Sequence, residues 1–272
     1  VEQDTNLKSN LLQQVDSSIV VADGRTLNYT GNEFNVGEHT LSLSGGGTFA
    51  NTMSLVLDNA ASKLLLSSIT VDNVSTSVDN SLGVEVENDS TITSLSVSNI
   101  TPVFIATGKT LSGTIGVTAG SIKLTDTGTL ASTVEMSGGT TLDADNSLTV
   151  SGALTQSGDI TIDVADTSTL TYTGSPISLG EFSLMLTGGG NLLSGGLDLN
   201  NANSKLLLSS ITVDKVSTSV DNSLGVEVLS DSTVRNLSLS QKLRLSVGSA
   251  QTLRITEPLI IPTAGMELAG SG

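Results

Sequence analysis

Acidic side chains that could act as a catalytic pair are the first chemistry this sequence suggests. Glu85, Glu87 and Asp89 alternate along one short segment, so their side chains would project from one side of a strand and its following turn. A pair of carboxyl groups can cleave a glycosidic bond as general acid and as base or nucleophile. A second copy of the segment carries Leu229 in place of the middle acid. This loss argues against a shared carboxylate mechanism, and we expect solvated surface charge.

His39, the single histidine, is the other candidate for proton transfer. It aligns with Phe182 in the second copy, which favours a turn or edge residue over a general base. Aromatic platforms for sugars are scarce, because the chain has two Tyr, four Phe and no Trp. We therefore predict no catalytic residue and no enzyme, with a β-helix carbohydrate-active enzyme as the least favoured alternative.

Calcium is the one cofactor to weigh for an acidic chain. The densest oxygen cluster is Asp143, Asp145 and Asn146, but the glycine-rich nonapeptide of calcium-binding β-rolls and the EF-hand loop are both missing. We interpret these residues as turn formers and predict no cofactor, with calcium as the alternative.

Charge and composition exclude several classes of protein. The 27 Asp and Glu residues against 11 Lys and Arg give a net charge of −16, whereas phosphate-backbone binding needs a concentrated basic surface. Nucleic acid is therefore not an expected partner. No apolar run approaches the roughly 18 residues that a membrane span requires. The absence of cysteine excludes disulfides, thiolate metal sites and cysteine catalysis.

The chain consists of two copies of one long unit. Residues 62–86 and 204–228 differ only where Asn73 is replaced by Lys215. The similarity extends towards both ends of the chain at an offset of about 142 residues. We predict two repeats of seven coils or nearly so, residues 1–142 and 143–272, continuous with each other.

A shorter period lies inside each copy. A threonine followed by an apolar residue recurs every 18 to 22 residues, at Thr26, Thr48, Thr70, Thr91, Thr110, Thr129, Thr169, Thr212, Thr233 and Thr252. Turn formers precede these positions, and short pieces with a period of two lie between them. A repeat of about 20 residues with two or three short strands is the size of one coil of a parallel β-solenoid.

We predict an all-β, right-handed parallel β-helix of about 13 coils. A left-handed solenoid usually carries strict six-residue repeats, which are missing. The threonine hydroxyls would stack in one outward column, with the next residue packed inward. The alternative is two Greek-key sandwiches of about 142 residues, in which nothing requires the threonine to return at this period. Ice binding would need two matched threonine columns, whereas strand propensity explains one.

Several fragments resemble the coils of a known family: residues 108–111 (GKTL), 127–130 (TGTL), 138–142 (GGTTL) and 146–152 (NSLTVSG). In these the chain resembles the β-helical passenger regions of bacterial autotransporters and filamentous-haemagglutinin-like adhesins. The resemblance implies a secreted or cell-surface protein and brings no shared catalytic residues.

Leu65 and Leu207 are candidates for a lateral contact. Each is the middle residue of a run of three leucines, so alternation would place it outside while its neighbours point inward. The two would recur seven coils apart, roughly 34 Å by the spacing of stacked strands. We expect side-by-side packing through them.

Basic residues gather near the C-terminus. Arg235 and Arg254 each follow a column threonine by two residues, so we expect them to stack, with Lys242 and Arg244 close by. Acidic residues lie near the N-terminus, at Glu2, Asp4, Asp16 and Asp23. A basic end facing an acidic end would favour head-to-tail stacking.

The ends of a solenoid expose unpaired strand edges. Residues 4–15 could form a short capping helix, with apolar residues at helical spacing, but they also fit the coil register. Residues 266–272 look like an interrupted coil. We expect either part of a longer array or a protomer whose ends pair with neighbours.

These observations predict a non-enzymatic extracellular structural protein that forms a filament, sheath or adhesin stalk on the cell surface. Its expected partner is itself or neighbouring repeats of a longer chain. The alternative is an adhesin module that binds a glycan or a receptor through its side face.

Overall fold

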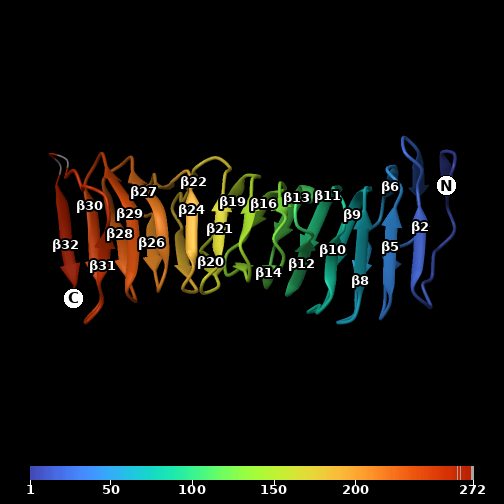
Figure 1. Ribbon diagram of the computed structural model, residues 1–272, viewed down its shortest axis with the longest axis horizontal. Coiled ribbons are helices and arrows are strands. Elements are labelled where there is room, and N and C mark those ends of the chain that lie inside the picture. The colour runs from blue at the N-terminus through green and yellow to red at the C-terminus, as the bar shows by residue number, and fades with distance from the viewer. Residues whose placement is uncertain (262, 264, 271–272) are drawn as a thin grey trace. The chain divides into compact units, whose positions relative to one another are not determined.

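The computed structural model describes residues 1–261, 263 and 265–270, and every regular element among them is a β-strand. None of these residues belongs to a helix that could cross a membrane. The strands pair in parallel and stack as a β-solenoid of about 13 coils, about 21 residues apart (Figure 1). The predicted all-β parallel solenoid is therefore confirmed.

The chain packs as two compact units, Val1–Glu135 and Met136–Gly272. The predicted division between residues 142 and 143 follows the sequence repeat, whereas these two units follow the packing of the coils. Within each unit every coil contributes strands to two sheets, which we name sheet A and sheet B.

In the first unit, sheet B contains the duplicated leucine run. Its strands are β2 (Ser17–Val20), β5 (Thr40–Ser44), β8 (Lys63–Ser67), β10 (Gly83–Val86), β12 (Thr101–Ile105) and β14 (Ser121–Leu124). The strands of sheet A are β1 (Thr5–Leu7), β3 (Thr26–Tyr29), β4 (Phe34–Asn35), β6 (Thr48–Asn51), β7 (Leu55–Leu57), β9 (Thr70–Thr76), β11 (Ser90–Val97), β13 (Thr110–Val117) and β15 (Thr129–Leu130). Strand β16 (Thr133–Met136) contains the boundary of the unit.

The second unit repeats this arrangement. The strands of sheet B are β17 (Thr141–Ala144), β20 (Ile160–Val164), β23 (Ser183–Thr187), β26 (Lys205–Leu208), β28 (Asn222–Val228), β30 (Leu243–Val247) and β32 (Met266–Gly270). The strands of sheet A are β18 (Leu148–Val150), β19 (Leu154–Gln156), β21 (Thr169–Tyr172), β22 (Ile177–Ser178), β24 (Asn191–Ser194), β25 (Leu197–Leu199), β27 (Thr212–Thr218), β29 (Ser232–Leu239) and β31 (Leu253–Ile255).

Aliphatic side chains stacked in register form the core. In sheet B of the first unit, Leu41 lies beside Leu64, which lies beside Val84, and Val84 lies beside Val103. All four are at most 1% exposed. Burial of each such side chain contributes about 1.5–3 kcal/mol. The composition, rich in Leu, Val and Ile and poor in aromatic residues, supplies this narrow layered core.

The start of the chain follows the coil register rather than forming a helix. Thr5–Leu7 is strand β1 and pairs in parallel with β3, with Leu7 beside Tyr29. Of the two interpretations of residues 4–15, the coil is therefore the right one over this strand. Pairing with β3 supplies the backbone hydrogen bonds that a helix would otherwise have made internally.

The predicted threonine column exists in the first unit. Thr26 lies beside Thr48, Thr48 beside Thr70 and Thr70 beside Thr91, while the residue after each threonine is buried. The hydroxyls therefore point outward and the apolar residues inward, as the alternation of a strand requires.

The column does not continue as predicted after Thr91. Its neighbour is Ser112 rather than Thr110, so the register slips by two residues between β11 and β13. The second unit has the same slip, because Arg254 rather than the next threonine lies beside Thr233. A slip of two residues keeps the side chains up to Ile92 on their own faces, since strand alternation has a period of two. Hydrophobic pattern alone therefore does not reveal it. Past a β-bulge between Ile92 and Ser94 the offset between β11 and β13 shortens by one residue.

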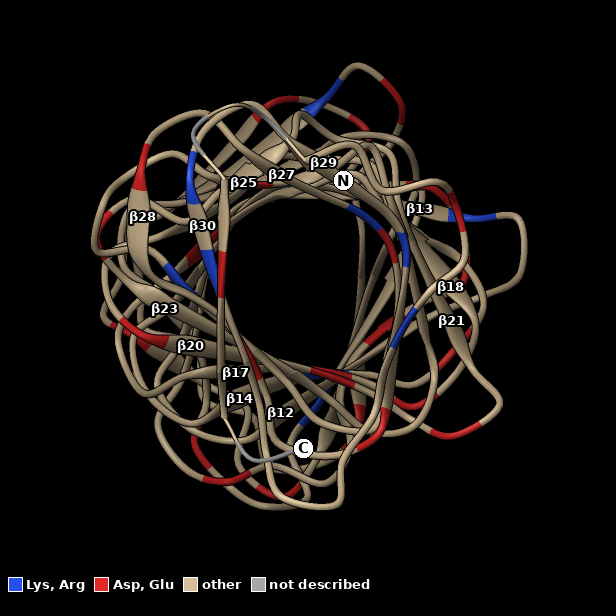
Figure 2. Cartoon of the chain, turned by 90° about the vertical axis from the view of Figure 1, so that its left-hand side faces the viewer, with Lys and Arg blue, Asp and Glu red and all other residues tan. Residues whose placement is uncertain are grey.

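Aspartates at the corners join successive coils. Each accepts a hydrogen bond from the backbone N–H of a residue one coil further on. Strand pairing does not use this N–H group. The pairs are Asp4–Thr26 (3.0 Å), Asp16–Thr40 (2.8 Å), Asp79–Ile100 (3.0 Å), Asp89–Thr110 (2.8 Å), Asp159–Ser183 (2.7 Å), Asp221–Lys242 (3.0 Å) and Asp231–Thr252 (2.7 Å). Figure 2 marks the acidic positions, which occur along the strands and in the turns of the coils. Part of the acidic composition is thus structural.

A buried asparagine holds the corner before β10 and its equivalent in β28. The Asn80 side chain donates to the carbonyls of Asn59 (2.8 Å) and Ser62 (2.9 Å) and accepts from the amides of Leu82 and Gly83. Asn80 is 5% exposed. Gly83 completes the corner with a φ of 57°, and a Cβ there would lie 1.9 Å from a carbonyl oxygen.

We predict that Asn80→Ala lowers the free energy of unfolding by about 3 kcal/mol, because it leaves several buried backbone groups without partners. Ser81→Ala removes one exposed side-chain bond from the same corner and should cost under about 1 kcal/mol. Urea unfolding followed by circular dichroism measures both. Equal losses for the two variants would contradict the role given to Asn80.

A buried tyrosine in β21 links stability to alkaline pH. Burial raises the pKa of the Tyr172 phenol above its ordinary value of 10.0, and the hydrogen bond from the Leu154 amide lowers it by less. The folded chain therefore keeps the phenol proton at a pH where the unfolded chain has lost it. The contribution of the protonated Tyr172 phenol to stability is therefore complete below the pKa of the unfolded chain. It is lost as the pH rises towards the pKa of the folded chain.

We predict that the free energy of unfolding of the wild-type chain falls as the pH rises above about 10. Tyr172→Phe should show a shallower fall, because it removes one of the groups that titrate differently in the two states. Urea unfolding over a series of alkaline pH values measures the slope. An unchanged slope in the variant would contradict the assignment.

Candidate functional site

The duplicated segment, residues 62–86 and 204–228, is the strongest candidate for a functional surface, because coils elsewhere keep their phase with little shared sequence. Part of its identity has an internal cause. Ser62 and Ser204 are fully buried, and the hydroxyl of each bridges two coils by donating to a glycine carbonyl at 2.5 Å. The inward apolar residues and the buried asparagines account for a further part of the sequence identity between the two copies. The outward residues remain to be explained.

Leu65 faces outward in β8, as predicted. Its neighbours in register are Ser42 on one coil and Glu85 on the next. Glu85 forms an ion pair with Lys63 at 2.5 Å, so this ion pair lies beside Leu65. Leu65 is half-buried rather than prominent, whereas Leu64 and Leu66 are fully buried.

The second copy reproduces this arrangement. Leu207 faces outward in β26 between Met185 and Glu227, and Lys205 pairs with Glu227 at 2.7 Å. Leu207 is likewise half-buried. The side chains of both pairs are about one-third exposed. Ion pairs open to solvent contribute about 0–1 kcal/mol, so stability does not explain why the pair occurs twice. A lateral contact through Leu65 and Leu207 stays a prediction.

A second pair of leucines is more exposed and was not expected from the sequence. Leu82 and Leu224 occupy equivalent corners and are 41% and 42% exposed. Each follows the buried asparagine of its corner, and the Leu82 amide donates to that side chain at 2.8 Å. The only sign of this exposure in the sequence was an apolar residue in the turn motif DNSLG. Strand periodicity predicts no direction for a side chain in a turn. An isolated exposed leucine is ordinary in itself.

The acidic residues weighed for catalysis serve different purposes. Glu85 is held by Lys63, Glu87 is exposed, and Asp89 uses one oxygen to accept the Thr110 amide. Two of the three carboxylates, those of Glu85 and Asp89, thus have partners within the fold.

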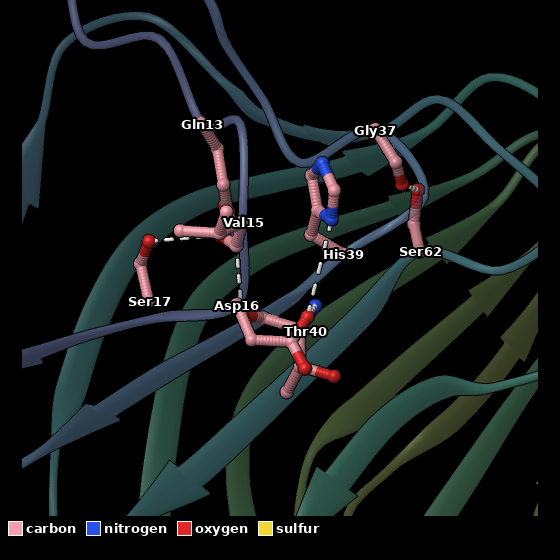
Figure 3. A network of polar contacts seen from close by, with 8 residues as sticks. All are labelled: Gln13, Val15, Asp16, Ser17, Gly37, His39, Thr40 and Ser62. Carbon is pink, nitrogen blue, oxygen red and sulfur yellow. Dashed lines mark hydrogen bonds and ion pairs between the residues drawn. The ribbon is translucent and has the colours of Figure 1, made fainter.

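His39 lies in a polar corner of the first unit (Figure 3). Its Nδ1 lies 4.0 Å from a carboxylate oxygen of Asp16, which itself accepts the Thr40 amide at 2.8 Å. Gln13 donates to the Thr40 carbonyl at 2.8 Å from the other side. These contacts fasten the turn before β5, in agreement with the predicted edge role.

The residues weighed for calcium lie along β17 and its following turn. Asp143 lies beside Asp163 of the next coil, and both take part in the stacked outward face of sheet B. Among the described residues, no group of three or more His, Asp or Glu side chains is placed to hold a metal ion.

The predicted stacking of Arg235 on Arg254 is wrong. The two-residue slip places Arg254 beside Thr233, so the two arginines are offset along the strands. Arg235 instead pairs with Asp214 of the preceding coil at 3.6 Å. The first copy has a version of this contact without the cation, in which the Thr93 hydroxyl donates to the Asp72 carboxylate at 3.3 Å.

The other two basic residues lie together. Lys242 pairs with Glu267 at 3.2 Å, and Arg244 lies beside Glu267 in register. Both line a surface hollow of about 400 Å³ with Asp221, Asn222, Ser223 and Glu267. The structure thus brings Lys242 and Arg244 together, with acids among them. An end-to-end contact through these residues stays a prediction.

Comparisons with protein-family models, with curated proteins and with solved structures found no match to this chain. The class of protein therefore rests on the fold itself, a parallel β-solenoid built from repeated coils.

One buried contact explains the single difference inside the duplicated segment. In the first copy, Asn51 donates to the Asn73 carbonyl at 2.6 Å, and Asn73 donates to the Asn51 carbonyl at 2.7 Å. In the second copy the position of Asn51 is taken by Ser194, whose hydroxyl is buried without a hydrogen bond. Serine is too short for this reciprocal contact, so the partner position is free to be Lys215.

We predict that Ser194→Asn together with Lys215→Asn recreates the reciprocal contact in the second copy and raises the free energy of unfolding by about 1–2 kcal/mol. Lys215→Asn alone should bring no gain, because its partner is still missing. Urea unfolding of the three chains measures this. An equal gain from the single substitution would contradict the explanation.

Proposed function

We propose that this chain is a non-enzymatic extracellular structural protein, a repetitive β-solenoid that builds a filament, sheath or adhesin stalk at the cell surface. The resemblance to autotransporter passenger regions and filamentous-haemagglutinin-like adhesins supports the extracellular location. Its partner is a further copy of the chain, or neighbouring repeats where the solenoid is longer.

The observation that carries the proposal is the repetition of one outward arrangement in both units. The Lys63–Glu85 pair beside Leu65 returns as the Lys205–Glu227 pair beside Leu207. Stability gains little from ion pairs that stay partly open to solvent. A surface that meets the same partner at regular intervals along an assembly accounts for both copies.

The construction of the coils also supports a structural role. Each coil is held to the next by parallel strand pairing and by corner aspartates and asparagines, and the same bonds recur in both units. Coils can therefore be added without a new type of contact, as in other solenoids. The charge of −16 keeps such a chain soluble and limits nonspecific association.

Two contacts would mediate self-association. Leu65 and Leu207 would pack laterally against another copy. The cluster of Lys242 and Arg244, with Arg235 and Arg254 nearby in sequence, would favour an acidic surface of a neighbour in head-to-tail stacking.

We predict that the purified wild-type chain forms elongated assemblies by negative-stain electron microscopy and that Leu65→Lys with Leu207→Lys shortens or abolishes them. Lysine at these positions would place an unpaired charge in the lateral contact. Light scattering measures the accompanying fall in particle mass.

The matched control is Ser18→Lys with Thr161→Lys. These residues occupy the same outward columns two coils before each leucine, so they add equal charge to the same sheet. Assembly of the control should equal that of the wild type. Identical assembly of both double variants would exclude the proposed lateral contact. A wild-type chain that stays monomeric at every concentration would overturn the structural proposal.

The second candidate function is a module that binds a glycan or a receptor through its side face. It is favoured by a different feature, a hydroxyl-lined surface groove that occurs at equivalent positions in both units.

A further inference from the structure

A groove lies in each unit at an equivalent corner, where a strand of sheet B leads into a strand of sheet A. The groove of the first unit, groove 1, has a volume of about 340 Å³ and is lined by Gly46, Ser68, Ile69, Thr70, Asp89, Ser90, Thr91, Thr110 and Ser112. The groove of the second unit, groove 2, has a volume of about 500 Å³ and is lined by the equivalent residues, with Arg254 in place of Ser112. Ligand sites occupy about 300–1,000 Å³, so both grooves are large enough for a small ligand or part of a chain.

The grooves exist because the coils change register there. Thr110 does not extend the column of Thr91 but lies further back, where its amide donates to Asp89 at 2.8 Å. The second unit repeats this with a bond of 2.7 Å from Thr252 to Asp231. In the first unit, β11 also has a β-bulge against β13 between Ile92 and Ser94. Bulges are common beside binding sites, because they redirect side chains away from the regular face.

The corner also holds a strained residue in both copies. Ser68 and Ser210 have φ values of 54° and 56°, in the left-handed region that favours glycine. The strain costs each of them about 1 kcal/mol. Glycine would relieve it, yet a serine hydroxyl is present at the edge of both grooves.

The lining of groove 1 decides which ligand it fits. Hydroxyls of Thr70, Thr91 and Ser112 lie side by side on three successive coils. Asp89 is exposed and has one carboxylate oxygen beyond the one that accepts the Thr110 amide. Ile69, the apolar member, is only 3% exposed. The surface offered to a ligand is therefore hydroxyls and one carboxylate.

This chemistry excludes several ligands. A phosphate would meet the Asp89 charge without any cation in the lining. A calcium ion needs six to eight oxygen ligands, usually with more than one carboxylate. An apolar ligand would bury little matching surface. A neutral molecule with many hydroxyl groups satisfies both the hydroxyls and the carboxylate.

We propose that the two grooves bind carbohydrate, a neutral polysaccharide chain in groove 1 and a chain with acidic sugars in groove 2. The proposal rests on the binding function named second above and is independent of assembly. Successive rungs of the threonine column are about 4.8 Å apart. This spacing is close to the length of one pyranose ring, so an extended chain can present one sugar to each coil.

Arg254 distinguishes the two grooves. It lies beside Thr233 at the register position where groove 1 has Ser112, it is exposed, and it makes no ion pair with the described residues. A guanidinium binds a carboxylate through two parallel hydrogen bonds. Groove 2 therefore prefers a uronic acid, whose carboxylate Arg254 can reach while the threonines bind its hydroxyls.

Binding at one groove is weak, because hydrogen bonds of exposed groups compete with water and neither lining contains an aromatic ring. We expect dissociation constants in the millimolar range for a short oligosaccharide. Two sites on one chain, and more in an assembly, would raise the overall affinity for a long polysaccharide through effective concentration.

The test is a titration of the isotopically labelled chain with xylohexaose, a neutral probe, and with hexagalacturonate, an acidic probe, followed by backbone amide shifts in nuclear magnetic resonance. Xylohexaose should shift the amides of Thr70 and Thr91, and hexagalacturonate those of Thr212 and Thr233. Binding of the acidic probe should weaken as salt is added, because its charge pair is exposed.

The variants test individual groups. Thr91→Val keeps the β-branched shape and removes one hydroxyl, so xylohexaose affinity should fall about fivefold. Thr26→Val is the matched control on the same column outside the groove and should change nothing. Arg254→Ser should reduce hexagalacturonate affinity about tenfold or more, and Ser112→Arg should create acidic-sugar binding in groove 1.

Three results would overturn the proposal: no shift at either groove with either probe, equal losses in Thr91→Val and Thr26→Val, or unchanged hexagalacturonate binding in Arg254→Ser. Light scattering of the same samples reports assembly separately. If the chain assembles but binds no sugar, the structural role is supported and the carbohydrate sites are not. If a monomer binds sugar, the carbohydrate sites are supported and the structural role is not.

Discussion

Parallel pairing between each coil and the next is the interaction on which the rest of this protein depends. A single coil consists of short strands that cannot bury their inward side chains alone, and both of its edges carry unpaired backbone groups. Stacking solves both problems at once, because the same step pairs the backbone and brings Leu64 beside Val84 and Leu41. Almost every other feature serves to keep this register.

At the corners other hydrogen bonds must hold successive coils together, since strand pairing stops where the chain turns. Aspartate carboxylates, the amides of Asn80 and Asn222 and the hydroxyls of Ser62 and Ser204 supply the missing hydrogen bonds there. An acidic and serine-rich composition, which could suggest only a solvated surface, is therefore partly a consequence of having so many corners. These groups are largely committed to the fold, which leaves the outward strand positions and the grooves for recognition.

Two kinds of outward surface follow from the same duplication. The leucines flanked by ion pairs lie on the regular face of sheet B, where a flat neighbour can pack. The hydroxyl-lined grooves lie at the corners, where the register slip opens the surface. A structural assembly and a carbohydrate site would therefore use different parts of each coil and could coexist in one protein.

The amino-acid sequence by itself determined the repeat, the period of about 20 residues, the inward and outward alternation and hence the parallel solenoid. Those properties follow from local alternation and from turn residues, which are visible along one chain. Only the tertiary structure decided which residues become neighbours across coils. The slip after Thr91 preserves the period of two, so the pattern could not report it, and it separated Arg235 from Arg254 and opened both grooves. The exposure of Leu82 was equally hidden, because a turn residue has no alternation from which its direction can be inferred.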